Sequence, residues 1–190
     1  MRAGLITLST AIDERSAGFH ALGRSSASGV ATAVITTSGT AVANLLPAAV
    51  EADRSSQPLL LISADRPLRL KNKGANQTVN QEAFLIPVCR WCGSGPLDGL
   101  SAALDHELQA LAENTWRHLH QQPGPVHLNL PFEEPLHPDL AQQNAFWSQW
   151  KRAEPEATTP NTELWKPTSH CAAPALDPDQ PGVIVAGPWR

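Results

Sequence analysis

The stretch Val30-Ala31-Thr32-Ala33-Val34-Ile35-Thr36-Thr37-Ser38-Gly39-Thr40 decides the fold. Residues 30–37 are β-branched or small and largely apolar, which is typical of a strand covered on both faces. Gly39 can take a positive φ and so form a tight turn. The next residues, 41–52, carry apolar side chains at helical spacing. A buried strand that passes through a turn into a helix is the repeating unit of a parallel α/β sheet.

The same two signals recur on both sides of this stretch. Further strands are expected at Leu5–Leu8, Leu59–Ser63 and Val126–Leu130, and further helices at Glu14–Ser25 and Ser101–Leu119. Pro47 should kink the helix over 41–52, because it removes one backbone hydrogen bond. The alternation of strands and helices predicts an α/β fold with a doubly wound, mostly parallel sheet.

Composition excludes several classes of partner. The 190 residues suffice for one ordinary core, and the formal net charge is −4 without any run of Lys or Arg. Nucleic acid is therefore not an expected partner. No apolar stretch approaches the roughly 18–20 residues of a membrane span. Three cysteines cannot all pair, which favours a reducing, cytoplasmic location.

The composition changes after Pro135 and predicts the domain organisation. Residues 137–181 hold seven prolines and three tryptophans, which predicts a linker with a short helix near Phe146 and Trp147. Residues 182–187, Gly-Val-Ile-Val-Ala-Gly, are typical of a buried strand before a glycine turn. We expect a domain over 1–136 that lacks its first strand, a linker over 137–181, and the first strand of a truncated central domain over 182–190.

Polar motifs follow the predicted strands. The turn before Thr40 could be a simple hydroxyl cap, or its free N–H groups could hold a phosphate or the edge of a heterocycle. Thr10 and Asp13 have the spacing of a capping box, which leaves Glu14 free for another role. Arg66 offers a fixed fork of donors to a carboxylate or phosphate, although it could equally form a surface salt bridge. Asn76 and Gln77 add two side-chain amides in the next loop.

Cys89 and Cys92 have the two-residue spacing of a zinc or redox pair. A structural zinc site needs four ligands, and no second pair lies at a suitable distance. No metal is therefore expected in this chain, and the role of the two thiols stays open.

Taken together, the motifs resemble the 2-succinyl-5-enolpyruvyl-6-hydroxy-3-cyclohexene-1-carboxylate synthase family of thiamine diphosphate enzymes. The resemblance rests on Asp13-Glu14-Arg15, Thr37-Ser38-Gly39-Thr40, Ala64-Asp65-Arg66-Pro67, Gly74-Ala75-Asn76-Gln77 and Pro131-Phe132-Glu133-Glu134-Pro135-Leu136. Acetohydroxyacid synthases usually carry Ser-Gly-Pro-Gly where this chain has Ser38-Gly39-Thr40-Ala41, and they lack the Gly-Ala-Asn-Gln loop. The sequence Ile12-Asp13-Glu14-Arg15 is similar to the corresponding sequence in cyanobacterial members of the family.

The resemblance implies an activity and roles for particular residues. Family members decarboxylate 2-oxoglutarate and add the succinic semialdehyde carbanion to isochorismate in menaquinone and phylloquinone biosynthesis. The implied catalytic residue is Glu14, which would hydrogen-bond the aminopyrimidine nitrogen of the cofactor, with Gly39 and Thr40 as further cofactor contacts. Arg66, Asn76 and Gln77 would face the substrates.

The resemblance also implies what this chain lacks. The family binds thiamine diphosphate through Mg²⁺ and forms its site between subunits of a homo-oligomer, a dimer or tetramer. The ligands of Mg²⁺ and the diphosphate belong to a domain that is not in this chain. The chain would thus be a fragment that holds about half a site, and by itself it should be inactive. The alternatives are another thiamine diphosphate carboligase or decarboxylase, of the acetohydroxyacid synthase type, and a non-catalytic remnant that only dimerises.

Overall fold

The structure is a computed structural model of the chain, and it describes residues 6–100, 103–134, 136–137 and 139–149. Four strands form one sheet in the order β1-β2-β4-β3: β1 (Thr32–Thr36), β2 (Leu59–Asp65), β3 (Trp91–Ser94) and β4 (Pro125–Pro131). Every neighbouring pair is parallel. The predicted α/β fold with a parallel, doubly wound sheet is confirmed.

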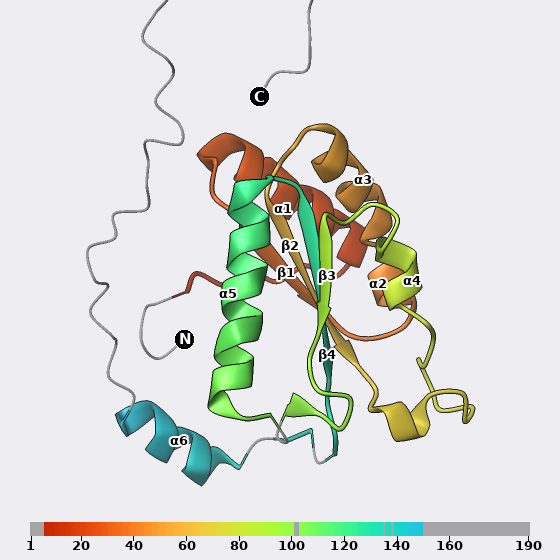
Figure 1. Cartoon of the computed structure of the whole chain (residues 1–190), viewed down its shortest axis with the longest axis vertical. Coiled ribbons are helices and arrows are strands. Elements are labelled where there is room, and N and C mark those ends of the chain that lie inside the picture. Colours follow the sequence, from red (N-terminus) through yellow and green to blue (C-terminus); the bar gives the residue numbers. More distant parts are fainter. Residues whose placement is uncertain (1–5, 101–102, 135, 138, 150–190) are drawn as a thin grey trace, which may run out of the picture. The chain divides into compact units, whose positions relative to one another are not determined.

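Helices cover both faces of this sheet (Figure 1). They are α1 (Glu14–Ser28), α2 (Thr40–Ala43), α3 (Leu46–Arg54), the 3₁₀ helix η1 (Leu68–Leu70), α4 (Glu82–Leu85) and α5 (Asp105–Gln121). α1 and α3 pack on each other and α3 on α4, whereas α5 packs on β3 and β4 from the opposite face. The change of face follows from the strand order. From β1 through β2 to β3 the chain crosses the sheet in one direction, and from β3 to β4 it returns in the other direction. Because the crossovers are right-handed, the reversal places α5 on the face opposite to α3 and α4.

The apolar core lies between the sheet and the helices α1, α3 and α4. Its fully buried members include Val42, Leu45, Ala48, Ala49, Ala52, Leu59, Leu61 and Leu85. Small residues let α1 and α3 approach closely, since a Cβ placed on Gly18 would lie 3.0 Å from the Cβ of Ala48. This packing fixes α1, and with it the position of Glu14.

Helix α1 begins with an aspartate cap. Asp13 has extended backbone angles, and its carboxylate accepts a hydrogen bond of 2.8 Å from the backbone N–H of Ser16. This hydrogen bond lowers the pKa of Asp13 below its ordinary value. The expected capping box from Thr10 is wrong, because Asp13 itself is the N-cap residue. Glu14 is consequently the first residue of α1.

The helix expected over 41–52 is interrupted, so the prediction of one helix kinked at Pro47 is wrong. α2 ends at Ala43 and α3 starts at Leu46, which puts Pro47 in the first turn of α3. Proline is tolerated there because the N–H groups of a first turn have no partner within the helix. The apolar spacing runs on through the break, since Val42, Leu45 and Ala49 are all buried.

The strand predictions were mixed. The cores of β1, β2 and β4 lie where predicted, but β3 was not predicted, and residues 6–8 are not in a strand. The strand expected over 182–187 lies outside the described residues.

β1 stands at one edge of the sheet: Val34 and Thr36 are buried against the helices, whereas Ile35 points to the other face and is 71% exposed.

A second unit of the chain begins at His137. Its described part contains α6 (Leu140–Gln149), which confirms the short helix predicted near Phe146 and Trp147. The domain boundaries at 136 and 181 stay predictions. None of the helices among the described residues is both long and apolar enough to cross a membrane.

Candidate functional site

Several of the predicted site residues lie at the carboxyl edge of the sheet. Gly39 and Thr40 come just after β1, and Arg66 comes just after β2. Because β1 and β2 are parallel neighbours, these residues reach the same edge, where doubly wound sheets bind ligands. Asn76 and Gln77 belong to the loop between η1 and α4.

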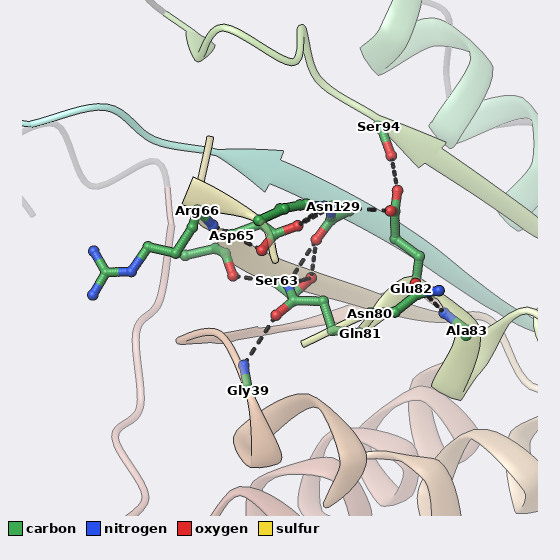
Figure 2. A network of polar contacts seen from close by, with 12 residues as sticks. Gly39, Ser63, Asp65, Arg66, Asn80, Gln81, Glu82, Ala83, Ser94 and Asn129 are labelled. Carbon is green, nitrogen blue, oxygen red and sulfur yellow. Dashed lines mark hydrogen bonds and ion pairs between the residues drawn. The ribbon is translucent and has the colours of Figure 1, made fainter. Parts of the chain in front are cut away.

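A buried glutamine, Gln81, joins this edge to the loop (Figure 2). Its side-chain oxygen accepts a hydrogen bond of 3.0 Å from the backbone N–H of Gly39. Its side-chain nitrogen lies 2.7 Å from Asn129 Oδ1, 2.9 Å from the carbonyl oxygen of Ala64 and 3.2 Å from Ser63 Oγ. Gln81 is fully buried, so these hydrogen bonds replace those it would make with water.

The Gly39 turn therefore differs from the free anion site that was one interpretation of its sequence. The N–H of Gly39 is already donated to Gln81, and α2 is only four residues long. Gly39 is buried, whereas Thr40 is exposed. Thr40 thus presents an accessible part of this turn.

Three polar side chains on neighbouring strands complete the buried network. Ser63 of β2 donates its hydroxyl proton to Asn129 Oδ1 of β4 at 2.9 Å. Because Ser63 has only one hydroxyl proton, Nε2 of His127 is the donor in its 2.7 Å contact with Ser63 Oγ. His127 is fully buried, and its other ring nitrogen, Nδ1, has no hydrogen-bond partner within the described part of the chain.

An ion pair closes the network on the loop side. The carboxylate of Asp65, which is fully buried, lies 2.7 Å from Nζ of Lys71 and accepts a hydrogen bond of 2.8 Å from Asn129 Nδ2. Its other oxygen accepts a hydrogen bond of 2.7 Å from the backbone N–H of Arg66. Lys71 also lies 3.6 Å from Glu82, at the start of α4. Asp65 thereby fixes the backbone from which the Arg66 side chain extends.

A second, exposed ion pair ties the same loop to the end of β4. Arg69 and Glu133 form a bidentate ion pair, in which Nε of Arg69 lies 2.8 Å from Oε2 of Glu133. Each charge favours the ionised form of its partner: hydrogen bonding to Glu133 raises the pKa of Arg69, and hydrogen bonding from Arg69 lowers the pKa of Glu133. The ion pair restrains the loop that follows Arg66.

The structure brings two of the predicted site residues into contact. Gly39 has φ +81 and ψ −138, and a Cβ at this position would lie 3.3 Å from the Cβ of Gln77. Gln77 itself has a positive φ of 56. The turn predicted to contact the cofactor and the loop predicted to contact substrate therefore meet at these two residues.

The remaining site residues present free polar groups. Glu14 and Arg66 are half-buried, and Asn76 is exposed. The Arg66 guanidinium points away from the buried network in Figure 2. Among the described residues, no hydrogen bond or ion pair engages the side chains of Glu14, Arg66, Asn76 or Gln77. All four side chains are thus available for a ligand. No hydrogen bond or ion pair among the described residues links Glu14 to Arg66, Asn76 or Gln77, however.

The buried network was not predicted from the sequence, although a signal for part of it exists. In the stretch 125–131, His127 and Asn129 alternate with apolar residues inside an otherwise apolar strand. Polar residues at such positions need hydrogen-bond partners when both faces of the sheet are covered. Their partner Gln81 carries no comparable signal, because it lies in a polar loop sequence.

Replacing Gly39 by alanine should lower the free energy of unfolding by about 1–3 kcal/mol, because its backbone angles are close to a region that only glycine adopts readily. Urea unfolding followed by circular dichroism measures the change. Gly23→Ala is the matched control: a Cβ there meets nothing within 4 Å, and alanine in a helix should stabilise by about 0.5–1 kcal/mol. Equal effects of the two substitutions would contradict the strained turn.

Comparison with known proteins shows which proteins this chain resembles. Residues 1–84 match the family model described as "Thiamine pyrophosphate enzyme, N-terminal TPP binding domain". A relative from Synechococcus sp. (strain CC9311), named 2-succinyl-5-enolpyruvyl-6-hydroxy-3-cyclohexene-1-carboxylate synthase, is 89% identical over 190 residues, which are 100% of this chain and 33% of the relative.

Two further relatives carry the same name. One from Synechococcus sp. (strain WH7803) is 60% identical over all of this chain and 32% of its own length, and one from Prochlorococcus marinus (strain MIT 9303) is 57% identical over all of this chain and 34% of its own length. The chain thus spans about one third of the length of the curated relatives it matches. The chain is thus similar, over residues 1–84, to the N-terminal domain of thiamine pyrophosphate enzymes and, along its whole length, to about one third of the length of relatives named 2-succinyl-5-enolpyruvyl-6-hydroxy-3-cyclohexene-1-carboxylate synthase.

Proposed function

We propose that the full-length protein containing this sequence decarboxylates 2-oxoglutarate and adds the remaining four-carbon unit to isochorismate, a step of menaquinone or phylloquinone biosynthesis. The observation that carries this proposal is the 89% identity, over every residue of the chain, to a relative named for the product of that reaction. Thiamine diphosphate, when bound, supplies the electron sink for breaking and making the carbon–carbon bonds.

The described residues fit a cofactor of this kind. The Glu14 carboxylate is half-buried, stands at the start of α1, and has no ion pair or hydrogen bond among the described residues. Such a group is free to hold a proton at a ring nitrogen of the aminopyrimidine. At Gly39 the absence of a side chain keeps the turn open beside Gln77, and Thr40 offers an exposed edge.

Substrate recognition is assigned to the loop side of the site. Arg66 would bind a substrate carboxylate, because its guanidinium offers two parallel donors and has no acidic partner among the described residues. Asn76 and Gln77 would hydrogen-bond substrate hydroxyl and carboxylate groups. The Gln81 network supports this arrangement by holding Gly39 in place.

We further propose that Mg²⁺ and the diphosphate bind through residues of another domain, and that the complete site forms in a homo-oligomer. Within the described part of the chain, no three His, Cys, Asp or Glu side chains are grouped so that they could hold a metal ion. A cytoplasmic location is proposed from the odd number of cysteines.

The test is an assay of the full-length protein with 2-oxoglutarate, isochorismate, thiamine diphosphate and Mg²⁺. The expected result is release of carbon dioxide coupled to formation of 2-succinyl-5-enolpyruvyl-6-hydroxy-3-cyclohexene-1-carboxylate, detected by mass spectrometry. Pyruvate is offered in a parallel reaction. Preferential use of pyruvate would support a carboligase of the acetohydroxyacid synthase type instead.

The role of Arg66 is tested by Arg66→Lys in the same protein. Lysine keeps the charge but loses the fork, so kcat/KM for the carboxylate substrate it contacts should fall about 5- to 150-fold, which corresponds to roughly 1–3 kcal/mol. Affinity for thiamine diphosphate should not change. Arg54→Lys is the control, because the Arg54 side chain is 82% exposed. An equal loss of cofactor affinity in Arg66→Lys would show that Arg66 shapes the cofactor site.

A further inference from the structure

Cys89 and Cys92 lie on the face of the sheet that carries α4. Cys89 lies four residues after the end of α4, and its N–H donates to the carbonyl oxygen of Leu85 at 2.9 Å. Side chains alternate along β3: Trp91 stacks on His118 of α5 at 5.3 Å between ring centroids, whereas Ser94 donates to Glu82 of α4. Cys92 shares the side of Ser94, so both thiols face the same layer. Both thiols are free, and both residues are half-buried.

A buried histidine stands beside Cys92. His127 of β4 is the cross-strand partner of Cys92 in the parallel register. The ring contacts Ser63 through Nε2, and its other nitrogen, Nδ1, is buried and has no hydrogen-bond partner among the described residues. A neutral imidazole with a free lone pair is a proton acceptor. The proposed carboligase reaction uses none of these three residues.

We propose that Cys89 and Cys92 form a peroxide-reactive thiol pair, in which Cys92 is the attacking thiolate, Cys89 is the resolving thiol and His127 is the neighbouring base. Both thiols lie on the side of the sheet that carries α4, and on that side His127, the cross-strand partner of Cys92, has a buried ring nitrogen without a hydrogen-bond partner among the described residues. The chemical class of the co-substrate is a hydroperoxide. The product is an intramolecular disulfide between residues 89 and 92.

The reaction is balanced in two steps. The Cys92 thiolate attacks one peroxide oxygen, so that an S–O bond forms, the O–O bond breaks, and the leaving oxygen takes a proton to become water or an alcohol. Cys89 then attacks the Cys92 sulfur, an S–S bond forms, the S–O bond breaks, and the departing hydroxide takes the Cys89 proton to become water. Two thiols lose two electrons and the peroxide gains them.

The electrostatics support this division of roles. Hydrogen bonding from Cys89, followed by the electrostatic interaction with His127, lowers the pKa of Cys92 to about 5, although burial and Glu82 oppose the shift. Hydrogen bonding to Cys92 and burial raise the pKa of Cys89. At neutral pH the negative charge therefore resides on Cys92, and the thiolate is the form that attacks a peroxide.

The sequence supplies a direct assay on the 190-residue chain. Trypsin cuts after Lys73, Arg90 and Arg117, so Cys89 and Cys92 fall in separate peptides, 74–90 and 91–117. The reduced protein is treated with stoichiometric hydrogen peroxide, denatured and digested without reductant. The expected result is that peptides 74–90 and 91–117 appear as one linked species that dithiothreitol separates.

Single cysteine variants separate the roles. In Cys89→Ser, Cys92 should stop at the sulfenic acid, which dimedone traps, whereas in Cys92→Ser the Cys89 thiol should stay reduced. Cys171→Ser is the matched control and should leave formation of the 89–92 disulfide unchanged. Circular dichroism confirms that each variant keeps the helix content of the parent chain.

Alkylation provides a second readout that does not depend on the disulfide. The rate at which iodoacetamide modifies Cys92 should stay nearly level between about pH 6 and pH 8, whereas an ordinary thiol with a pKa of about 8.5 speeds up roughly 75-fold over that range. The same chain in denaturing urea should show the ordinary rise. The proposal is overturned if Cys92 in the native chain shows the urea profile, or if peroxide joins Cys171 to either thiol as readily as it joins Cys89 to Cys92.

Discussion

Replacing Glu14 by glutamine is expected to slow turnover of the full-length protein by about two to four orders of magnitude, the usual contribution of a group that transfers a proton. Glutamine keeps the shape of the side chain and removes its ionisable proton. No hydrogen bond or ion pair within the described structure depends on the Glu14 carboxylate, so folding should be unaffected. The measurement is kcat with saturating 2-oxoglutarate and isochorismate.

The control for this substitution is Glu51→Gln, at an exposed position of α3. It removes the same charge from the same domain and should leave kcat unchanged. Near-normal turnover of Glu14→Gln would refute the catalytic assignment. A loss of kcat accompanied by a loss of thermal stability would instead assign Glu14 to the fold.

The second large effect concerns stability. Lys71→Met should lower the free energy of unfolding by about 2–4 kcal/mol, because it leaves the Asp65 carboxylate buried without its cation. The Lys71 side chain is 19% exposed, so the expected loss is smaller than for a fully buried ion pair. Lys73→Met is the matched control at an exposed position of the same loop and should change stability little. Urea unfolding of the 190-residue chain measures both.

A double variant separates the ion pair from other effects of Lys71. Asp65→Asn removes the charge but keeps an oxygen that can accept from Asn129 or from the Arg66 N–H. The double variant Lys71→Met/Asp65→Asn should therefore recover part of the stability lost in Lys71→Met. If the double variant loses as much stability as the two single variants together, the charges of Lys71 and Asp65 are not coupled.

The elements that sequence alone predicted are those that carry their own pattern. β1, β2 and β4 are rich in β-branched or leucine residues, so that their burial can be predicted from their own sequences. β3 is not: Trp91-Cys92-Gly93-Ser94 is short, contains a glycine, and becomes a strand only by pairing with β4. Its existence depends on a contact more than thirty residues away along the chain.

The candidate site divides in the same way. Gly39, Arg66 and Gln77 were predicted because a turn glycine, a cation after a strand and a polar loop are local features, and the resemblance to a known family added their roles. The contacts of Gln81 were not predictable, because they require β4 to insert between β2 and β3, which places Asn129 next to residues 48 and 66 positions earlier. Sequence reasoning could name polar residues inside β4 but could not name their partners.

The position of β1 at the edge of the sheet has a practical consequence for work with the isolated chain. Its outer edge carries backbone N–H and C=O groups that no other strand among the described residues pairs, and Ile35 lies exposed beside them. The segment Thr32-Ala33-Val34-Ile35-Thr36 is uncharged and has high β propensity, which is the composition of segments that add to one another as intermolecular sheet. Concentrated solutions of this chain should therefore assemble through β1 into thioflavin-positive aggregates, and Ile35→Lys, which places a charge on the exposed face of that edge, should keep the chain dispersed.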